Sequence, residues 1–293
     1  MSITKYEVFA KVVELGSLTK AADALGFTQS GISHIISSLE NQFGFPLLIR
    51  SRSGIKLTVN GEQLLQPVRE ILKWNEQLKQ EVAYIHGLEV GTITIGTFTS
   101  VSVHWLPGMI KQFRTDYPQI EFKLMEGGYL EIEQWMEAGV IDCGFISLPT
   151  RDNFEVFPLK KDRILGIVSN DHPLSNESIL SFSQIANEDF IIPKDGSDYD
   201  VKRVLGKAGI KPNVKFSAGD DYAIIAMVEK GLGISILPEL VLKGHKHNVT
   251  MLELEERSFR SLGIAVTSMK YASPATKRFV KYVQSWVESQ EGD

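Results

Sequence analysis

The sequence predicts an α/β protein with a small helical N-terminal domain, a long linking helix and a larger C-terminal domain of strands and helices. Three observations predict this fold class. Apolar residues recur at helical spacing over the first 45 residues, and a repeat of four- and three-residue steps follows Thr58. Short apolar runs alternate with helical patterns after residue 91. We therefore expect domains at residues 1–58, 59–88 and 89–293.

The composition is that of a globular chain of about two domains, with 293 residues of which 43% are hydrophobic and 23% charged. The start lacks the basic and apolar regions of a signal peptide, and no apolar stretch reaches the roughly 18 residues of a membrane helix. Cys143 is the only cysteine, which excludes an internal disulfide and a cysteine-based zinc site. We expect a cytoplasmic protein with no membrane partner.

Charge is unevenly distributed along the chain, whose formal net charge is −5. Residues 1–58 hold six Lys and Arg against four Asp and Glu, and residues 59–88 hold three against four. The remaining residues hold 22 against 28. Because phosphate neutralisation needs cations only where DNA lies, a basic head on an acidic body would direct DNA to the N-terminal domain.

Three helices are predicted within the first 45 residues. Ser17 and Thr28 are placed to cap the second and third helices, and Gly16, Gly26 and Gly44 follow the three apolar patterns as stops. Two short apolar runs then flank a glycine-containing turn at residues 51–54, which predicts a β-hairpin.

A long fourth helix is predicted after Thr58, which can cap it. Its apolar repeat has the spacing of a heptad seam and comprises Leu64, Val68, Ile71, Asn75, Leu78, Val82 and Ile85. This pattern indicates that two such helices pair, with Asn75 fixing their register, and so predicts a homodimer. The alternative is a single helix that lies on its own domain.

The remainder alternates between strands and helices. Strands are expected at 92–95, 121–124, 142–146, 164–168, 190–192, 214–216, 234–237 and 262–266. Helices are expected at 109–117, 130–138, 222–230 and 274–288. Alternation of this kind predicts parallel sheets with helices on both faces.

The third helix carries a polar, uncharged stripe on its outer side. Its members are Gln29, Ser30, Ser33, His34 and Ser37. Such donors and acceptors suit base edges and phosphates in a major groove, whereas a solvated helix face usually carries Glu and Lys pairs. Ala21 and Ala22 are small where two helices cross, which completes a helix-turn-helix whose hairpin is the wing.

At these residues the chain resembles the LysR-type transcriptional regulators. The resemblance covers about sixty residues: Phe9, Val12, Leu15, Gly16, Ser17, Ala21, Ala22, Leu25, Thr28, Gln29, Ser30, Ile32, Ser33, Ile36, Leu39, Glu40, Gly44, Leu47, Leu48, Ile49, Arg50, Leu57, Thr58 and Gly61. The chain departs from the family pattern at Leu48, where Phe is usual, and at Ser53, where Arg is frequent.

The resemblance implies which residues contact double-stranded DNA. Bases and nearby phosphates would be touched by the helix stripe, and the wing would hold the backbone through Arg50, Arg52 and Lys56. Arg50 has an alternative role as an ion pair with Glu40 or Glu62. The family also implies a homotetramer made from pairs of dimers, and RNA polymerase as a further partner.

A weaker resemblance to the family's effector-binding domain continues through residues 126–142, 172–174 and 228–238. It implies a fold like that of periplasmic solute-binding proteins, with a small-molecule effector in a cleft between two α/β subdomains. We place subdomain I at about 92–162 and 267–293, and subdomain II at about 163–266.

Effector contacts are expected where polar residues follow strands of this domain. The first group is the hydroxyl-rich segment with Thr97, Thr99, Ser100 and Ser102. The alternative role of Ser102 is to cap the next helix. The others are Gly127, Ser197, Asp198 and Asp220. The alternative role of Asp220 or Asp221 is to cap the helix that begins near Tyr222. If these carboxylates line the cleft, they indicate an effector with an amino or other cationic group.

No catalytic or metal-ligating constellation is recognisable in the sequence. Cys143 lies within an apolar strand as a core residue, and His245 to His247 read as a solvated loop rather than a metal site. No nucleophile–base pair or phosphate-binding loop is present. We expect a regulator that is not an enzyme and needs no cofactor beyond its effector; the alternative is a solute-binding protein or an enzyme on a two-lobed fold.

Overall fold

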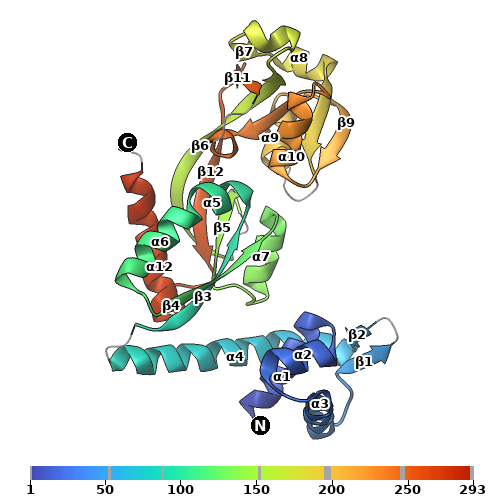
Figure 1. Cartoon of the computed structure of the whole chain (residues 1–293), viewed down its shortest axis with the longest axis vertical. Helices are drawn as coiled ribbons and strands as arrows, with labels where there is room; N and C mark the ends of the chain where they lie inside the picture. Colours follow the sequence, from blue (N-terminus) through green and yellow to red (C-terminus); the bar gives the residue numbers. More distant parts are fainter. Residues whose placement is uncertain are drawn as a thin grey trace. The chain divides into compact units, whose positions relative to one another are not determined.

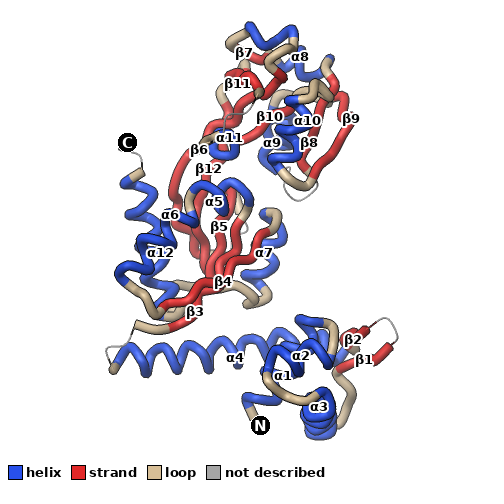
Figure 2. The backbone as a smooth tube through the Cα atoms, viewed as in Figure 1, coloured by secondary structure: helices blue, strands red, loops and turns tan. Residues whose placement is uncertain are grey.

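The computed structural model describes residues 2–51, 54–86, 89–150, 153–194, 199–244 and 248–290 (Figures 1 and 2). The chain divides into two compact units, the first comprising residues 1–86 with 138–140 and the second residues 87–137 with 141–293. None of the helices in these described ranges is long and apolar enough to cross a membrane.

The first unit contains the predicted three helices, hairpin and long helix. They are α1 (Ile3–Leu15), α2 (Leu18–Leu25), α3 (Gln29–Phe43), β1 (Leu48–Ser51), β2 (Gly54–Leu57) and α4 (Val59–Ile85). Ser17, Thr28 and Thr58 accept hydrogen bonds from backbone amides at the starts of α2, α3 and α4, so all three predicted N-caps are confirmed.

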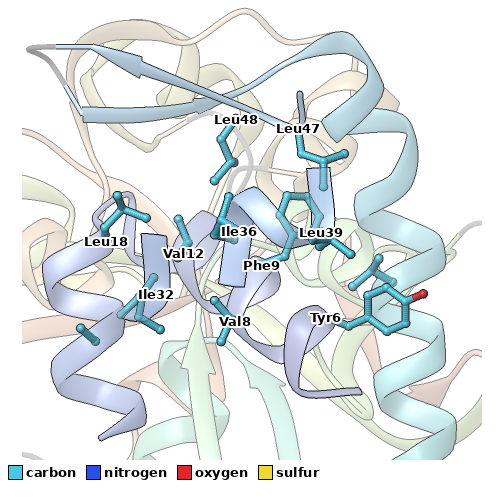
Figure 3. Packing of buried hydrophobic residues seen from close by; sticks show 13 residues of the cluster. Tyr6, Val8, Phe9, Val12, Leu18, Ile32, Ile36, Leu39, Leu47 and Leu48 are labelled. Carbon is cyan, nitrogen blue, oxygen red and sulfur yellow. The ribbon is translucent and has the colours of Figure 1, made fainter. Parts of the chain in front are cut away.

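The core of this unit lies where α1, α2 and α3 meet beneath the hairpin (Figure 3). Phe9 and Val12 of α1 pack with Ile32 and Ile36 of α3, and all four side chains are fully buried. Ala21 is also fully buried, because only a small side chain lets α2 lie this close to its neighbours. The helical periodicity of the sequence therefore predicted the correct inner faces.

Helix α4 divides its apolar repeat between two environments. Val68 is buried and Leu64 packs against the core of the first unit. Farther along the helix, the apolar side chains of the repeat are exposed: Ile71, Leu78, Val82 and Ile85. The first part of the seam thus belongs to the chain's own core, and only the second part remains available to another helix.

The second unit is built around a mixed eight-stranded sheet. Its strands are β3 (Gly91–Thr97), β4 (Ile120–Glu126), β5 (Cys143–Leu148), β6 (Glu155–Ser169), β7 (Ile179–Leu180), β10 (Ser235–Pro238), β11 (Val249–Leu254) and β12 (Ser258–Val266). The order is β4-β3-β5-β12-β6-β11-β7, with β10 also paired to β6. A separate parallel pair is formed by β8 (Asp189–Pro193) and β9 (Asn213–Ala218).

Helices complete two α/β lobes that are joined by the long strands β6 and β12 (Figure 1). The first lobe carries α5 (Thr99–His104), α6 (Leu106–Asp116), α7 (Tyr129–Glu137) and α12 (Pro274–Ser289) around β3, β4 and β5. The second carries η1 (Pro173–Asn176), α8 (Phe182–Asn187), α9 (Tyr199–Lys207), α10 (Asp221–Glu229) and α11 (Glu239–Leu242). The predicted fold class is confirmed.

The expected parallel sheets are found only in part, because the large sheet is mixed. Strands β3, β4 and β5 are parallel to one another, but β12 is antiparallel to both β5 and β6. The sequence predicts only the last third of β6, because Pro158 and the polar run Lys160–Arg163 interrupt the apolar pattern of its first part. That part is a strand because it pairs with β12 between the lobes, which is a tertiary constraint.

Gly61 offers a test of how closely α4 approaches the hairpin. A Cβ atom at Gly61 would lie 2.2 Å from the carbonyl oxygen of Leu47, and a backbone atom has little freedom to move. We expect Gly61→Ala to lower the free energy of unfolding by about 2–3 kcal/mol. In α9, Gly206→Ala meets no atom within 4 Å and should leave stability unchanged or raise it by up to about 1 kcal/mol. Chemical denaturation of both variants measures this; equal stabilities would contradict the close approach.

Candidate DNA interface and effector site

The outer face of α3 presents the predicted polar stripe to solvent. Gln29, Ser30, His34 and Ser37 are exposed, and Ser33 is half-buried. The face is held in place because Ile32, Ile36 and Leu39 lie buried on the opposite side of the helix. Thr28 caps the helix through the Gly31 amide, and its hydroxyl also lies 3.1 Å from that of Ser30.

The hairpin brings basic side chains beside this face. Arg50 of β1 donates from Nη1 to Oγ of Ser33 over 3.1 Å, and Lys56 is exposed on β2. Arg52 lies outside the described residues. Glu40 accepts hydrogen bonds from the amides of Leu47 and Leu48 at 2.8 and 3.1 Å. Arg50 is therefore bonded to the recognition helix, whereas Glu40 fixes the start of the hairpin instead of pairing with Arg50.

The second unit contains a cavity of about 420 Å³ at the junction of its two lobes. The first lobe contributes Phe98, Thr99, Glu126, Gly127, Gly128, Tyr129 and Glu131. The second lobe and the strands that join the lobes contribute Pro193, Lys194, Asp200, Val201, Gly219, Asp220, Asp221, Leu237, Pro238 and Arg260. This size lies within the range of small-molecule pockets in proteins.

Only some of the expected effector residues line this cavity. Thr99, Gly127 and Asp220 do, and Asp220 also caps α10 by accepting from the amides of Tyr222 and Ala223 at 2.7 and 3.0 Å. Ser197 and Asp198 lie outside the described residues.

The other three hydroxyl residues of the first expected group are used within the protein. Ser102 donates to the hydroxyl of Thr97, whose side chain is buried, over 3.2 Å. Ser100 is buried and accepts from Arg260 over 2.8 Å. Thr97, Ser100 and Ser102 therefore do not line the cavity, because their hydroxyls are engaged within the fold.

Arg260 is the central charge of the cavity and is almost fully buried. Its Nε donates to a carboxylate oxygen of Asp162 at 2.8 Å, and Nη2 forms an ion pair with the same oxygen at 2.7 Å. Nη1 donates to the Tyr129 hydroxyl at 2.9 Å. The guanidinium also lies over the ring of Phe98. Burial lowers the pKa of Arg260, but the neighbouring Tyr129 and Asp162 outweigh it, so the pKa is raised and the cation persists.

A second carboxylate extends this network across the lobes. Asp200, on α9 of the second lobe, accepts from the Tyr129 hydroxyl at 3.0 Å and from the Ser147 hydroxyl at 3.1 Å, both in the first lobe. Arg203 pairs with the same carboxylate at 3.2 Å. Burial raises the pKa of Tyr129, which keeps the hydroxyl protonated as the donor to Asp200. Asp200 and Arg260 are therefore both neutralised by partners within the fold.

Sequence reasoning missed three important residues of the cavity: Arg260, Tyr129 and Asp221. Arg260 stands out in the sequence only as one cation before the apolar run of β12, and its partners lie 98 to 160 positions away along the chain. The segment of Asp220 and Asp221 is expected from the sequence to face the cleft or to cap the helix, but Asp221 is not among the predicted effector contacts. The one available signal was the pair of adjacent acidic residues before α10.

Comparison with known proteins identifies the family. Residues 3–62 match the model of the bacterial regulatory helix-turn-helix protein of the lysR family, and residues 86–288 match the LysR substrate binding domain. The chain is 37% identical over 285 residues to the uncharacterised HTH-type transcriptional regulator YvbU of Bacillus subtilis, covering 96% of this chain and 97% of that protein. The chain belongs to the LysR family of DNA-binding transcriptional regulators, with an effector-binding domain.

Solved structures share the fold over nearly the whole chain. A full-length OxyR variant from Pseudomonas aeruginosa gives a TM-score of 0.77 at 19% identity, covering 98% of this chain and 95% of that one. Full-length CbnR in complex with its target DNA gives 0.69 at 22% identity, covering 98% and 100%. The relatives found are transcriptional regulators and not enzymes.

The burial of Arg260 predicts how the second unit responds to substitution. Arg260→Met should lower the free energy of unfolding by about 3–5 kcal/mol, because Asp162 is left buried without its cation. Adding Asp162→Leu should recover much of this loss. As a control, Arg163→Met removes partly exposed ion pairs with Glu239 and Glu253 and, because neither carboxylate is left enclosed, should cost no more than about 1–2 kcal/mol. Urea denaturation distinguishes the cases; similar losses for Arg260→Met and Arg163→Met would contradict the central role of Arg260.

Proposed function

We propose that this chain is a cytoplasmic, effector-controlled regulator that reads its operator through the outer face of α3. The observation that carries this proposal is the exposed, uncharged stripe of Gln29, Ser30, Ser33, His34 and Ser37, with Arg50 bonded to Ser33 beside it. The stripe supplies base-reading groups and the hairpin supplies cations for phosphates, Arg50, Lys56 and Arg52 among them. A small molecule in the cavity of the second unit would be the effector, and no other cofactor is required.

The exposed part of the α4 seam supports assembly. Apolar side chains of this size at Ile71, Leu78, Val82 and Ile85 gain stability when a second helix covers them. We propose a homodimer through α4, which presents two copies of α3 to a site with dyad symmetry. Association of two dimers into a tetramer, and contact with RNA polymerase at the promoter, complete the proposal.

Effector binding would control transcription as a shift between existing arrangements of the subunits. The cavity adjoins both lobes of the second unit, so a ligand can favour one relative position of the lobes over another. Transmission of that preference to the DNA-bound unit would change the bend or spacing of the operator.

Selection of fragments from random duplex DNA by the purified protein tests the DNA-reading role. We expect enrichment of a dyad-symmetric site. Gln29→Ala should weaken binding to that site by about 1–3 kcal/mol and leave non-specific binding nearly unchanged, because only base contacts are lost. Gln63→Ala, on the exposed face of α4, is the matched control and should alter neither affinity. No enrichment, or an equal loss on both kinds of DNA, would refute the proposed reading of bases by α3.

Disruption of the α4 seam tests the dimer. Leu78→Glu places a charge in the proposed helix pair and should shift the protein from dimer to monomer at micromolar concentration, as measured by sedimentation velocity. Gln77→Glu makes the same change in charge outside the seam and should leave the dimer intact. Unchanged sedimentation of the Leu78 variant would place the dimer interface elsewhere.

A further inference from the structure

The carboxylate of Asp221 lines the effector cavity and is not used by the fold. Asp221 is the first residue of α10, where the preceding Asp220 already caps the helix. The Asp221 side chain makes no hydrogen bond or ion pair with the residues that the structure describes. Burial raises its pKa to about 6, and the attraction of Arg260 only partly offsets that effect. Keeping this carboxylate in the cavity therefore costs stability.

Titratable groups on several elements lie around the cavity with Asp221. They are Arg260 of β12, Glu126 of β4, Tyr129 of α7, Asp200 of α9, Lys194 after β8, and Asp220 and Tyr222 beside it on the chain. Asp220 and Glu126 repel the ionised form of Asp221. Arg260 and Asp200 are neutralised by Asp162 and Arg203, which do not line the cavity.

The remaining charge of the lining is strongly negative. Once the two internally paired groups are set aside, Glu126, Glu131, Asp220 and Asp221 are opposed among the described lining residues by Lys194 alone, which is exposed. An anionic effector would meet repulsion here, and the one buried cation is already engaged in hydrogen bonds. A chelated metal ion is not favoured, since the described residues contain no group of three His, Cys, Asp or Glu arranged to hold one.

We propose that this cavity binds a small organic cation, whose protonated amine pairs with the Asp221 carboxylate while Glu126 and Asp220 lie nearby. The inference rests on the proposed function, because it names the chemical class of the effector. An ammonium group supplies the hydrogen-bond donors and the positive charge that Asp221 lacks. Tyr129 and Phe98, whose rings meet edge to face at 4.9 Å, offer aromatic surface for the apolar part of the molecule.

Isothermal titration calorimetry on the full-length protein at pH 7.5 tests the chemical class. The amines are putrescine, tyramine and lysine, and 1,4-butanediol and 4-(2-hydroxyethyl)phenol are the uncharged counterparts of the first two. Benzoate and succinate represent anionic effectors. We expect at least one amine to bind, while the alcohols and the two anions do not.

The substitution Asp221→Asn tests the residue. Loss of one partner of an enclosed charge pair should weaken amine binding by at least about thirtyfold. Asp171→Asn is the matched control, on an exposed turn after β6, and should bind as the wild type does. Because Asp221 is unpaired, its Asn variant should also melt at the same or a higher temperature. A lower melting temperature with unchanged amine binding would show that Asp221 only supports the start of α10, and would overturn the proposal.

The pH dependence gives an independent readout. Asp221 must be ionised to pair with the amine, and its pKa of about 6 lies between pH 5 and 7.5. Affinity should therefore fall by about tenfold from pH 7.5 to pH 5, while the amine itself stays protonated. The Asp221→Asn variant should lose this dependence. An affinity that is independent of pH in the wild type would contradict a role for Asp221.

Failure of this inference can be separated from failure of the proposed function by measuring operator binding in the same titrations. If benzoate or succinate binds and alters operator binding while no amine does, the amine assignment is wrong and effector control stands. If neither amines nor anions bind or alter operator binding, the amine assignment and effector control through this cavity both fall, whereas the reading of DNA by α3 depends on the fragment selection.

Discussion

The second unit is organised around the buried positive charge of Arg260. A guanidinium enclosed by protein is stable only if each hydrogen-bonding direction meets a partner, and here the partners come from β6, α5 and α7. Asp162 neutralises the charge and also accepts the amide of Leu240 at the start of α11. One side chain thereby joins the two long strands and the first lobe, and the Tyr129–Asp200 hydrogen bond extends the connection to the second lobe.

This network also determines what the cavity can bind. Had Asp162 been absent, Arg260 would have faced the cavity as a free cation and would have attracted a carboxylate or phosphate. Because Asp162 neutralises Arg260, the electrostatic character of the cavity is set by its acidic lining residues, Glu126, Glu131, Asp220 and Asp221. Three of the four expected hydroxyl residues do not line the cavity because they bond within the protein. Ser100 accepts a hydrogen bond from Arg260, and Ser102 donates one to Thr97.

The sequence predicted the first unit well because its signals are local. Capping residues such as Thr28 and Thr58 act on amides three positions away, and the helical spacing of Phe9 and Val12 reports directly on burial. The cavity was predicted poorly because its chemistry depends on long-range pairing. Nothing local to Arg260 indicates Asp162, and the polar start of β6 becomes a strand only through its partner β12. Local pattern likewise could not decide whether Asp220 or Asp221 caps α10.

Two features of the chain are energetically incomplete. The second half of the α4 seam leaves large apolar side chains such as Leu78 in water, although the first half of the same repeat is buried. Asp221 makes no hydrogen bond with the described residues, although the two buried charges of the cavity lining, Asp200 and Arg260, are paired within the fold. In proteins, such local costs concentrate where binding requires them. The two features concern different units and different kinds of interaction, apolar burial in one and ion pairing in the other. The proposed second copy of the chain would cover the exposed seam of α4, and the proposed amine would pair with Asp221, so each proposal supplies stabilisation where the chain alone leaves it unrealised.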